Sequence, residues 1–163
     1  MTLAEWAWIA LAAYAIHMLE EFMLNWRDWA RAVIGLPVSW ADFYVTNGIV
    51  VVLGIAQANL APSLPFFPLA FASLMLVNAV FFHVLPVIRM RGRYSPGVTT
   101  AILLFLPVGI SVFCSAHTAG GLSWATGLGA SAAGVLLMAT PIVFLKIRDK
   151  PYFRQAEGPP ADG

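Results

Sequence analysis

The sequence predicts an all-α integral membrane protein, a bundle of five transmembrane helices with its N-terminus outside and its C-terminus in the cytoplasm. Three observations support this prediction. The 163 residues are 60% hydrophobic and only 10% charged, whereas soluble domains have about 45–50% and about 25%. Five apolar runs reach the roughly 17–25 residues that a helix needs to cross a bilayer. The basic residues fall in alternate connections between these runs.

The predicted spans cover residues 5–25, 43–60, 66–88, 98–116 and 122–145. Helices are expected even in the second run, which is rich in Val and Ile, because a lone strand in lipid would leave its backbone unpaired. The Trp-rich connection between the first two spans favours a short helix at the membrane interface. We expect residues 1–147 to form one transmembrane domain and residues 148–163 to form a disordered cytoplasmic tail.

The distribution of positive charge predicts the orientation. All nine Lys and Arg residues lie in the first connection, the third connection or the tail. Five spans place these three regions on one face of the membrane, and the positive-inside rule makes that face cytoplasmic. Four spans would put cations on both faces, so we reject that arrangement. We therefore expect a multi-pass protein of the plasma membrane whose partner is the lipid bilayer, and no basic patch indicates nucleic acid.

The first span interrupts its apolar pattern with His17, Glu20 and Glu21. A charged group deep in a spanning helix costs about 2.5–3.5 kcal/mol, so these side chains need partners. Their i, i+3, i+4 spacing puts them on one side of a helix. They are expected roughly 6–12 Å inside the cytoplasmic end of the span. His83 precedes Arg89 by six residues in the third span, which gives it a similar depth.

Histidine and carboxylate are the ligand types of metal sites in the cores of helical bundles. The predicted catalytic residues, which are also the predicted ligands of a divalent iron, zinc or manganese ion, are His17, Glu20, Glu21 and His83. Without a metal, the two adjacent carboxyls would share a proton and act as a general acid. The predicted substrate-binding residues, which come from the same depth, are Asn47, Asn78, Tyr94 and Ser95.

These residues also have explanations that involve no activity. Glu21 can extend toward the lipid headgroups. The histidines His17 and His83 can be packing partners of one another, and Asn78 can bond a neighbouring helix. The single cysteine, Cys114, has no possible partner within the chain and lies in an apolar run, where it acts as a small hydrophobic residue.

Three motifs occur in a fixed order along the chain. Residues 17–21 match H-x-x-E-E, Asn78 and His83 follow in the third span, and residues 94–97 match Y-S-P-G. The chain resembles the HXXEE family of small integral membrane proteins over about residues 10–147. The resemblance implies that these are the signature positions, and it implies no particular reaction. Here four residues separate Asn78 from His83, one more than in the family pattern, which puts them about 140° apart on an α-helix.

We weigh three functions. The favoured one is a membrane-embedded enzyme that acts on a lipophilic small molecule, as an isomerase, hydratase or cyclase by acid–base chemistry or as an oxidase or hydrolase with a metal. The second is a proton-coupled or metal-ion transporter, against which stand the missing polar groups in the outer half and the absence of internal repeats. The third is a structural or accessory membrane subunit with a polar core.

Overall fold

The computed structural model describes residues 1–147 and residue 150. The tail predicted at residues 148–163 therefore lies almost entirely outside the described residues. Within the described part, all regular elements are helical and no strand occurs, which confirms the all-α fold class. Four helices are long and apolar enough to cross a membrane, or five if the bent pair formed by the first two helices is one span.

The helices of the described residues are α1 (Leu3–Met23), α2 (Trp26–Val33), α3 (Trp40–Leu60), α4 (Phe66–Asn78), η1 (Ala79–Val84), α5 (Leu85–Arg89), α6 (Val98–Thr100), η2 (Ala101–Phe105), α7 (Leu106–Thr118) and α8 (Trp124–Ile147). The segments η1 and η2 are π-helical. α4, η1 and α5 form one continuous helix, and α6, η2 and α7 form another. That these helices make up one transmembrane domain ending at residue 147 stays a prediction.

Local hydrogen bonds fix where the first long helices begin. Thr2 and Glu5 form a capping box at the start of α1, and Ser39 and Asp42 form one at the start of α3. Each pair satisfies two backbone N–H groups that a helix end leaves unpaired. Between them, Asn25 takes a left-handed conformation with φ 57° and turns the chain from α1 into α2. The two helices are bent by 72° relative to one another.

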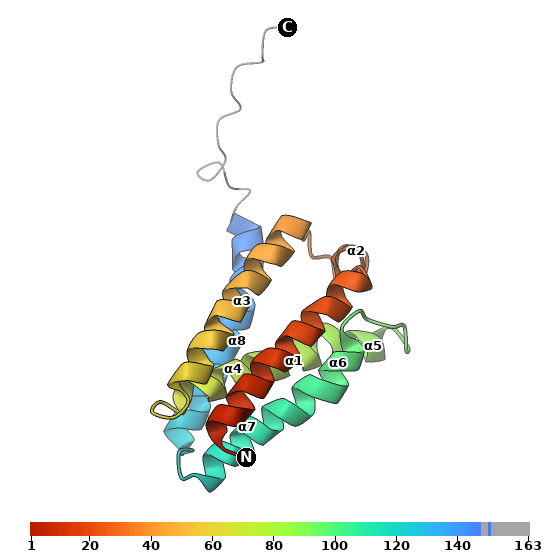
Figure 1. The fold of residues 1–163 in the computed structure, drawn as a ribbon. Helices are drawn as coiled ribbons and strands as arrows, with labels where there is room; N and C mark the ends of the chain where they lie inside the picture. Colours follow the sequence, from red (N-terminus) through yellow and green to blue (C-terminus); the bar gives the residue numbers. More distant parts are fainter. Residues whose placement is uncertain (148–149, 151–163) are drawn as a thin grey trace, which may run out of the picture.

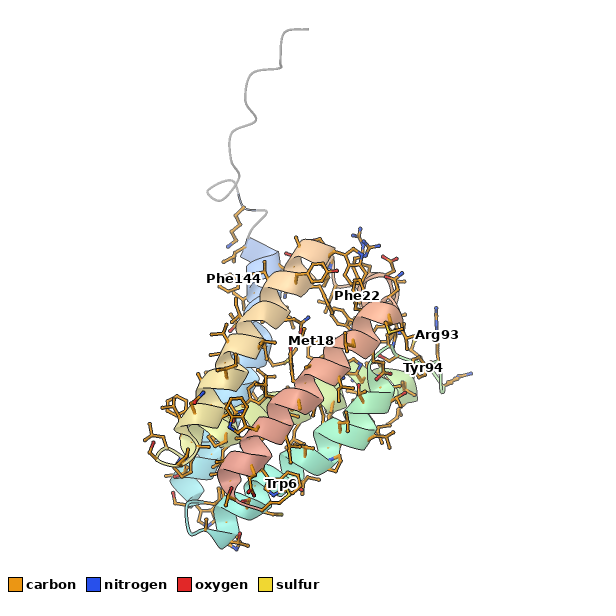
Figure 2. All side chains as sticks on the ribbon, viewed as in Figure 1. Trp6, Met18, Phe22, Arg93, Tyr94 and Phe144 are labelled. Atoms are coloured by element: carbon orange, nitrogen blue, oxygen red, sulfur yellow. The ribbon has the colours of Figure 1, made fainter. Side chains whose placement is uncertain are left out.

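Consecutive membrane-length helices run in opposite directions (Figure 1). The helix formed by α4, η1 and α5 lies at the centre and packs against α1, α3, α7 and α8. Arg93 and Tyr94 lie at the end of the bundle where α1 stops (Figure 2). The basic residues of α2, of residues 89–93 and of the end of α8 therefore lie toward the same end. Which side of a membrane this end faces stays a prediction.

The contact between α4 and α8 depends on small residues. A side chain added at Gly134 of α8 would place its Cβ 2.5 Å from Cβ of Ser73 and 2.7 Å from the backbone nitrogen of Leu74. Glycine at this position lets the two backbones approach closely, as is common between membrane helices. In contrast, α3 and α8 have no extensive contact with one another within the described residues. The bundle is therefore closed on the α4 side of α8 and open on its α3 side.

Each π-helical segment lies just before a proline. η1 is followed by Pro86 and η2 by Pro107. A proline inside a helix removes one backbone hydrogen bond and collides with the carbonyl four residues earlier, which a local widening of the helix relieves. In η1, residues five apart lie about one turn apart, so Asn78 and His83 are closer in angle than on the α-helix that the sequence predicted.

Candidate metal centre

Two imidazole rings and one carboxylate meet between α1 and η1. Oε1 of Glu21 lies 3.5 Å from Nε2 of His17 and 3.4 Å from Nε2 of His83. The two rings are perpendicular, with their centres 4.8 Å apart. All three side chains are buried, and their ligand atoms lie within 4.8 Å of one another. We refer to His17, Glu21 and His83 as the His–Glu cluster.

The hydrogen bonds of Thr100 determine which nitrogen of His17 carries the proton. The Thr100 hydroxyl donates to Oε2 of Glu20 at 2.5 Å. Because this uses its only hydrogen, the same oxygen accepts from Nδ1 of His17 at 2.8 Å. Nε2 of neutral His17 is therefore the unprotonated nitrogen, and its electron pair points toward Glu21.

Ser95 acts in the same way on His83. Pro86 has no N–H to donate to the carbonyl of Phe82 four residues earlier, and that carbonyl accepts from the Ser95 hydroxyl at 3.4 Å. Oγ of Ser95 lies 3.3 Å from Nδ1 of His83, and because its hydrogen is directed at Phe82 we assign Nδ1 as the donor. In this assignment, Nε2 of neutral His83 is the unprotonated nitrogen. Among the described residues, neither His17 Nε2 nor His83 Nε2 has a hydrogen-bond partner.

Gly97 lies directly against both rings. A Cβ at this position would be 2.5 Å from Cε1 of His83 and 2.8 Å from Cε1 of His17. The residue also has φ 95°, a left-handed conformation in which side chains other than glycine are strained. Its lack of a side chain therefore serves both the turn before α6 and the placement of the two imidazoles.

Glu20 is not part of the His–Glu cluster, whereas the predicted ligand set included it. Its carboxylate accepts from the backbone N–H of Thr99 at 3.2 Å and of Thr100 at 2.8 Å, and from the Tyr94 hydroxyl. Successive residues on a helix are about 100° apart, so Glu20 and Glu21 face different neighbours. We call this arrangement of Glu20, Tyr94, Thr99 and Thr100 the Glu20 cap, because it satisfies the N–H groups at the start of α6.

Tyr94 and Ser95 contact the glutamate and the histidine rather than an open substrate site. Partial burial and the hydrogen bond to the Glu20 carboxylate raise the pKa of Tyr94. Its hydroxyl therefore stays a neutral donor beyond the usual range of a phenol. Ser95 is fully buried against His83. Substrate binding by these two residues stays a prediction.

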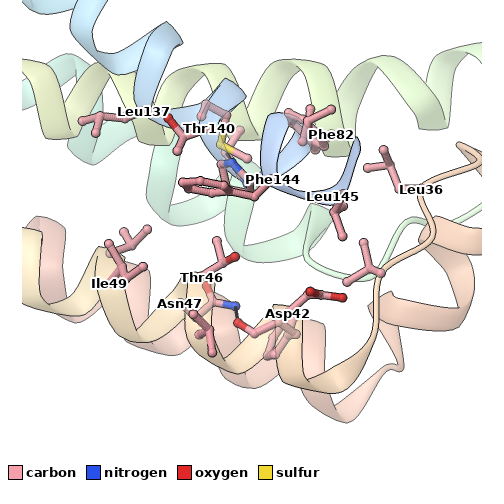
Figure 3. A pocket seen from close by; sticks show the side chains of 18 of the residues that line it. Leu36, Asp42, Thr46, Asn47, Ile49, Phe82, Leu137, Thr140, Phe144 and Leu145 are labelled. Atoms are coloured by element: carbon pink, nitrogen blue, oxygen red, sulfur yellow. Dashed lines mark hydrogen bonds between the residues drawn. The ribbon is translucent and has the colours of Figure 1, made fainter. Parts of the chain in front are cut away.

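A cavity of about 630 Å³ adjoins the His–Glu cluster, with Glu21 in its wall. It lies between α3 and α8, and Phe82 of η1 also lines it (Figure 3). In Figure 3, Phe144 of α8 and Thr46 of α3 project into the space between the two helices. The volume is within the range of about 300–1,000 Å³ for small-molecule sites.

The comparison with protein families decides the relationship of the chain. A family model described as "Protein of unknown function with HXXEE motif" matches residues 8–112, well over half of the chain. The chain belongs to the HXXEE family. No curated protein and no solved structure matches it. In this HXXEE protein the matched residues include the whole His–Glu cluster and the Glu20 cap, and they stop before α8, which forms one wall of the cavity.

Two of the predicted substrate-binding residues line the cavity of this HXXEE protein. Asn47 accepts from the Tyr14 hydroxyl at 2.6 Å and donates to the carbonyl of Phe43 at 3.0 Å. Within the described residues, the nitrogen of Asn78 contacts Sδ of Met138 at 3.9 Å. Oδ1 of Asn78 is buried and has no hydrogen-bond partner in the described part of the chain. Asn47 is therefore satisfied within the fold, whereas Asn78 is not.

Two contributing residues were not predicted from the sequence. Tyr14 lies one helical turn before His17, and its ring stacks on Phe105 with their centres 5.8 Å apart. Thr100 lies three residues after Gly97, within the first turn of a span. The available signal for Tyr14 was its position one helical turn from His17. The available signal for Thr100 was its position just after the glycine that ends the Y-S-P-G motif. Neither signal says which side chain the residue contacts.

Proposed function

We propose that this HXXEE protein is a membrane-embedded enzyme that holds one divalent metal ion at His17, Glu21 and His83 and acts on a lipophilic small molecule. The observation that supports this most strongly is the meeting of two histidine nitrogens and one carboxylate oxygen at one buried point, where neither nitrogen has a hydrogen-bond partner in the described residues. Electron pairs repel one another, so such a site is stabilised by a cation between them.

Two of the three distances within the His–Glu cluster fit a shared ion, and the two Nε2 atoms, which lie within 4.8 Å of one another, would move closer together on binding. Two ligand atoms bonded to one metal at about 2.1 Å with a tetrahedral angle lie about 3.4 Å apart. Oε1 of Glu21 is 3.5 Å and 3.4 Å from the two Nε2 atoms. Two histidines and one carboxylate are the ligands of many iron and zinc sites that keep positions open for substrate. Iron, zinc and manganese are therefore the candidate ions.

A shared proton is the second candidate for the same site, because Glu21 lies at similar distances from both histidines. One proton on either Nε2 would pair that histidine with the carboxylate and leave the other nitrogen unpaired. The cluster would then act as a buried acid and base. A metal ion would satisfy all three atoms at once, which a single proton cannot do.

The surrounding residues have defined tasks in this proposal. When bound, the ion would supply Lewis-acid catalysis or an activated water. Thr100 and Ser95 hold the Nδ1 sides of the two rings, which keeps the Nε2 electron pairs directed at the ion. The cavity brings a lipophilic substrate to Glu21. The orientation is part of the proposal as well: the site would lie in the cytoplasmic half of the plasma membrane.

Metal analysis of the full chain, purified in mild detergent, tests the proposal. After exposure to Fe²⁺, Zn²⁺ or Mn²⁺ and removal of excess metal, we expect one ion per chain in the wild type. His83→Ala and Glu21→Gln should each reduce the bound metal to background, because each removes one of the three proposed ligands and the two that remain do not hold the ion. His117→Ala removes an exposed histidine of α7 and is the matched control, with metal content unchanged.

The outcomes separate the candidates. If the folded wild type binds no metal above background after exposure to Fe²⁺, Zn²⁺ or Mn²⁺, the metal proposal is contradicted and the shared proton is favoured. Loss of folding in both ligand variants, measured by thermal unfolding, would favour a structural role for the polar core. Metal bound equally by wild type and Glu21→Gln would place the ion elsewhere.

A further inference from the structure

Asn78, a residue of the cavity wall, has an unused hydrogen-bond acceptor. Asn78 is only 8% exposed, and its Oδ1 is buried without a partner in the described residues, although the residue lines the cavity. Leaving a buried acceptor unpaired costs about 1–3 kcal/mol. A ligand that donates one hydrogen bond in the cavity would recover this free energy. Among the asparagines that line the cavity, Asn47 has no such need, because its oxygen already accepts from Tyr14.

The charge of the lining restricts the ligand. Glu21 and Asp42 line the cavity, and no Lys or Arg of the described residues does. In the metal-free state, a carboxylate or phosphate headgroup would be repelled by Glu21, and no Lys or Arg in the described lining compensates. In the metal-bound state, an ammonium headgroup would be repelled by the ion that we propose for the His–Glu cluster. A neutral hydroxyl avoids both conflicts and supplies the donor that Asn78 lacks.

The shape of the cavity favours a single apolar chain. Most of the lining is apolar, and its volume is that of a site for one drug-sized molecule rather than for a two-chain lipid. Phe144 of α8 lines the cavity and is 58% exposed, so the cavity is open at this residue. Leu36, Val38 and Leu145 line the end near α2, and the last two are buried. A chain would therefore enter sideways between the helices, from the bilayer.

We infer that the cavity binds a neutral single-chain amphiphile whose terminal hydroxyl donates to Oδ1 of Asn78, beside Glu21. This names the substrate class of the proposed enzyme and in that sense rests on the proposed function. The hydroxyl end lies at the polar end of the cavity and the hydrocarbon lies between α3 and α8. The long-chain alcohol is bound by shape and by one hydrogen bond, which is how small-molecule sites combine an apolar wall with a few placed polar groups.

Photolabelling of the full chain in lipid nanodiscs tests this inference. The probes are a twelve-carbon alcohol with a photoreactive group on its chain and the methyl ether of the same molecule, which cannot donate a hydrogen bond. We expect saturable labelling of α3 and α8 by the alcohol, with a half-saturating concentration about tenfold lower than that of the ether. Asn78→Leu should raise the value for the alcohol about tenfold and leave that of the ether unchanged.

Two further variants control the experiment. Asn59→Leu removes an exposed asparagine at the far end of α3 and should leave labelling unchanged. Ile49→Trp adds volume from a residue that is 55% exposed and lines the cavity, so it should fold and should block both probes. Equal affinity for alcohol and ether, competition by dodecanoate as strong as by dodecanol, or labelling unaffected by Ile49→Trp would each overturn the inference.

The metal measurement distinguishes this inference from the proposed function. His83→Ala is expected to lose metal and to keep selective labelling by the alcohol. If the wild type binds no metal but labels selectively, the metal proposal fails and the ligand class stands. If it binds metal but does not distinguish alcohol from ether, the ligand class fails and the metal proposal stands.

Discussion

Glu20 and Glu21 are adjacent glutamates on α1, yet their surroundings are opposite. In the Glu20 cap, the carboxylate accepts from two backbone N–H groups and two hydroxyls, and the side chain is partly exposed. In the His–Glu cluster, the Glu21 carboxylate is buried and faces two imidazole nitrogens without a hydrogen-bond partner in the described residues. The comparison teaches that a carboxylate whose hydrogen bonds are supplied by the fold has a structural partner set, whereas one that faces unpaired nitrogens is a candidate ligand.

Thr100 joins the two regions, since it donates to Glu20 and accepts from His17. The cap therefore has a second task besides satisfying the start of α6. It fixes the tautomer and orientation of one proposed metal ligand, which is the usual role of residues behind the ligands of a metal. Three predictions test how strongly the regions depend on one another.

The largest effect is expected at Gly97. Gly97→Ala would push a methyl group into both imidazoles, and the proposed metal should fall to background while the protein stays folded. Gly92→Ala is the matched control, because Gly92 has φ 90° and nothing within 4 Å of an added Cβ. Both variants pay a similar backbone cost of about 1–2 kcal/mol, so equal metal content in the two would contradict the assigned site. Metal analysis and thermal unfolding measure the two effects separately.

A smaller effect is expected when the link between the regions is cut. Thr100→Val keeps the shape of the side chain and removes the hydroxyl, so His17 loses the partner of its Nδ1. Residues behind the ligands typically contribute about 10–100-fold to metal affinity, and we expect a loss of that size in metal titration. Thr99→Val, one residue earlier and exposed, should change the affinity less than about threefold. A larger loss of metal affinity in Thr99→Val than in Thr100→Val would show that the Glu20 cap does not support the His–Glu cluster.

The smallest effect concerns pH and the outer part of the cap. Tyr94→Phe removes one donor to Glu20 and should reduce stability by about 0.5–1 kcal/mol. The pKa of Tyr94 is raised in the fold, so this stabilisation is complete below the unfolded value of about 10 and disappears as the pH rises through the higher folded value. Thermal unfolding of both proteins from pH 7 upward should show a constant difference that shrinks only in the alkaline range.

The matching control for this experiment is Tyr44→Phe, which changes an exposed tyrosine of α3 outside the cap. It should show no difference from wild type at neutral pH. A Tyr94→Phe difference that instead shrinks toward acid pH would mean that the Glu20 carboxylate, rather than the phenol, limits the interaction.

The sequence could predict the class of the fold because class depends on composition and run length. A chain with so few charges and such long apolar runs has no alternative to helices in lipid, and the described residues confirm the all-α class and the membrane-length helices. The family was also predictable, because the H-x-x-E-E and Y-S-P-G motifs are short local patterns. The orientation of the termini and the roles of the site residues stay predictions.

The sequence by itself determined that His17, two adjacent glutamates and His83 lie at similar depths in apolar helices, since depth follows from helical rise and span position. Only the tertiary structure decided that Glu21 meets both histidines while Glu20 caps α6, because this depends on which helix packs against each side of α1. The π-helical turn of η1 and the cavity between α3 and α8 also arise from packing. Local sequence patterns determine how far along its helix a residue lies, whereas contacts between distant segments determine which neighbour its side chain faces.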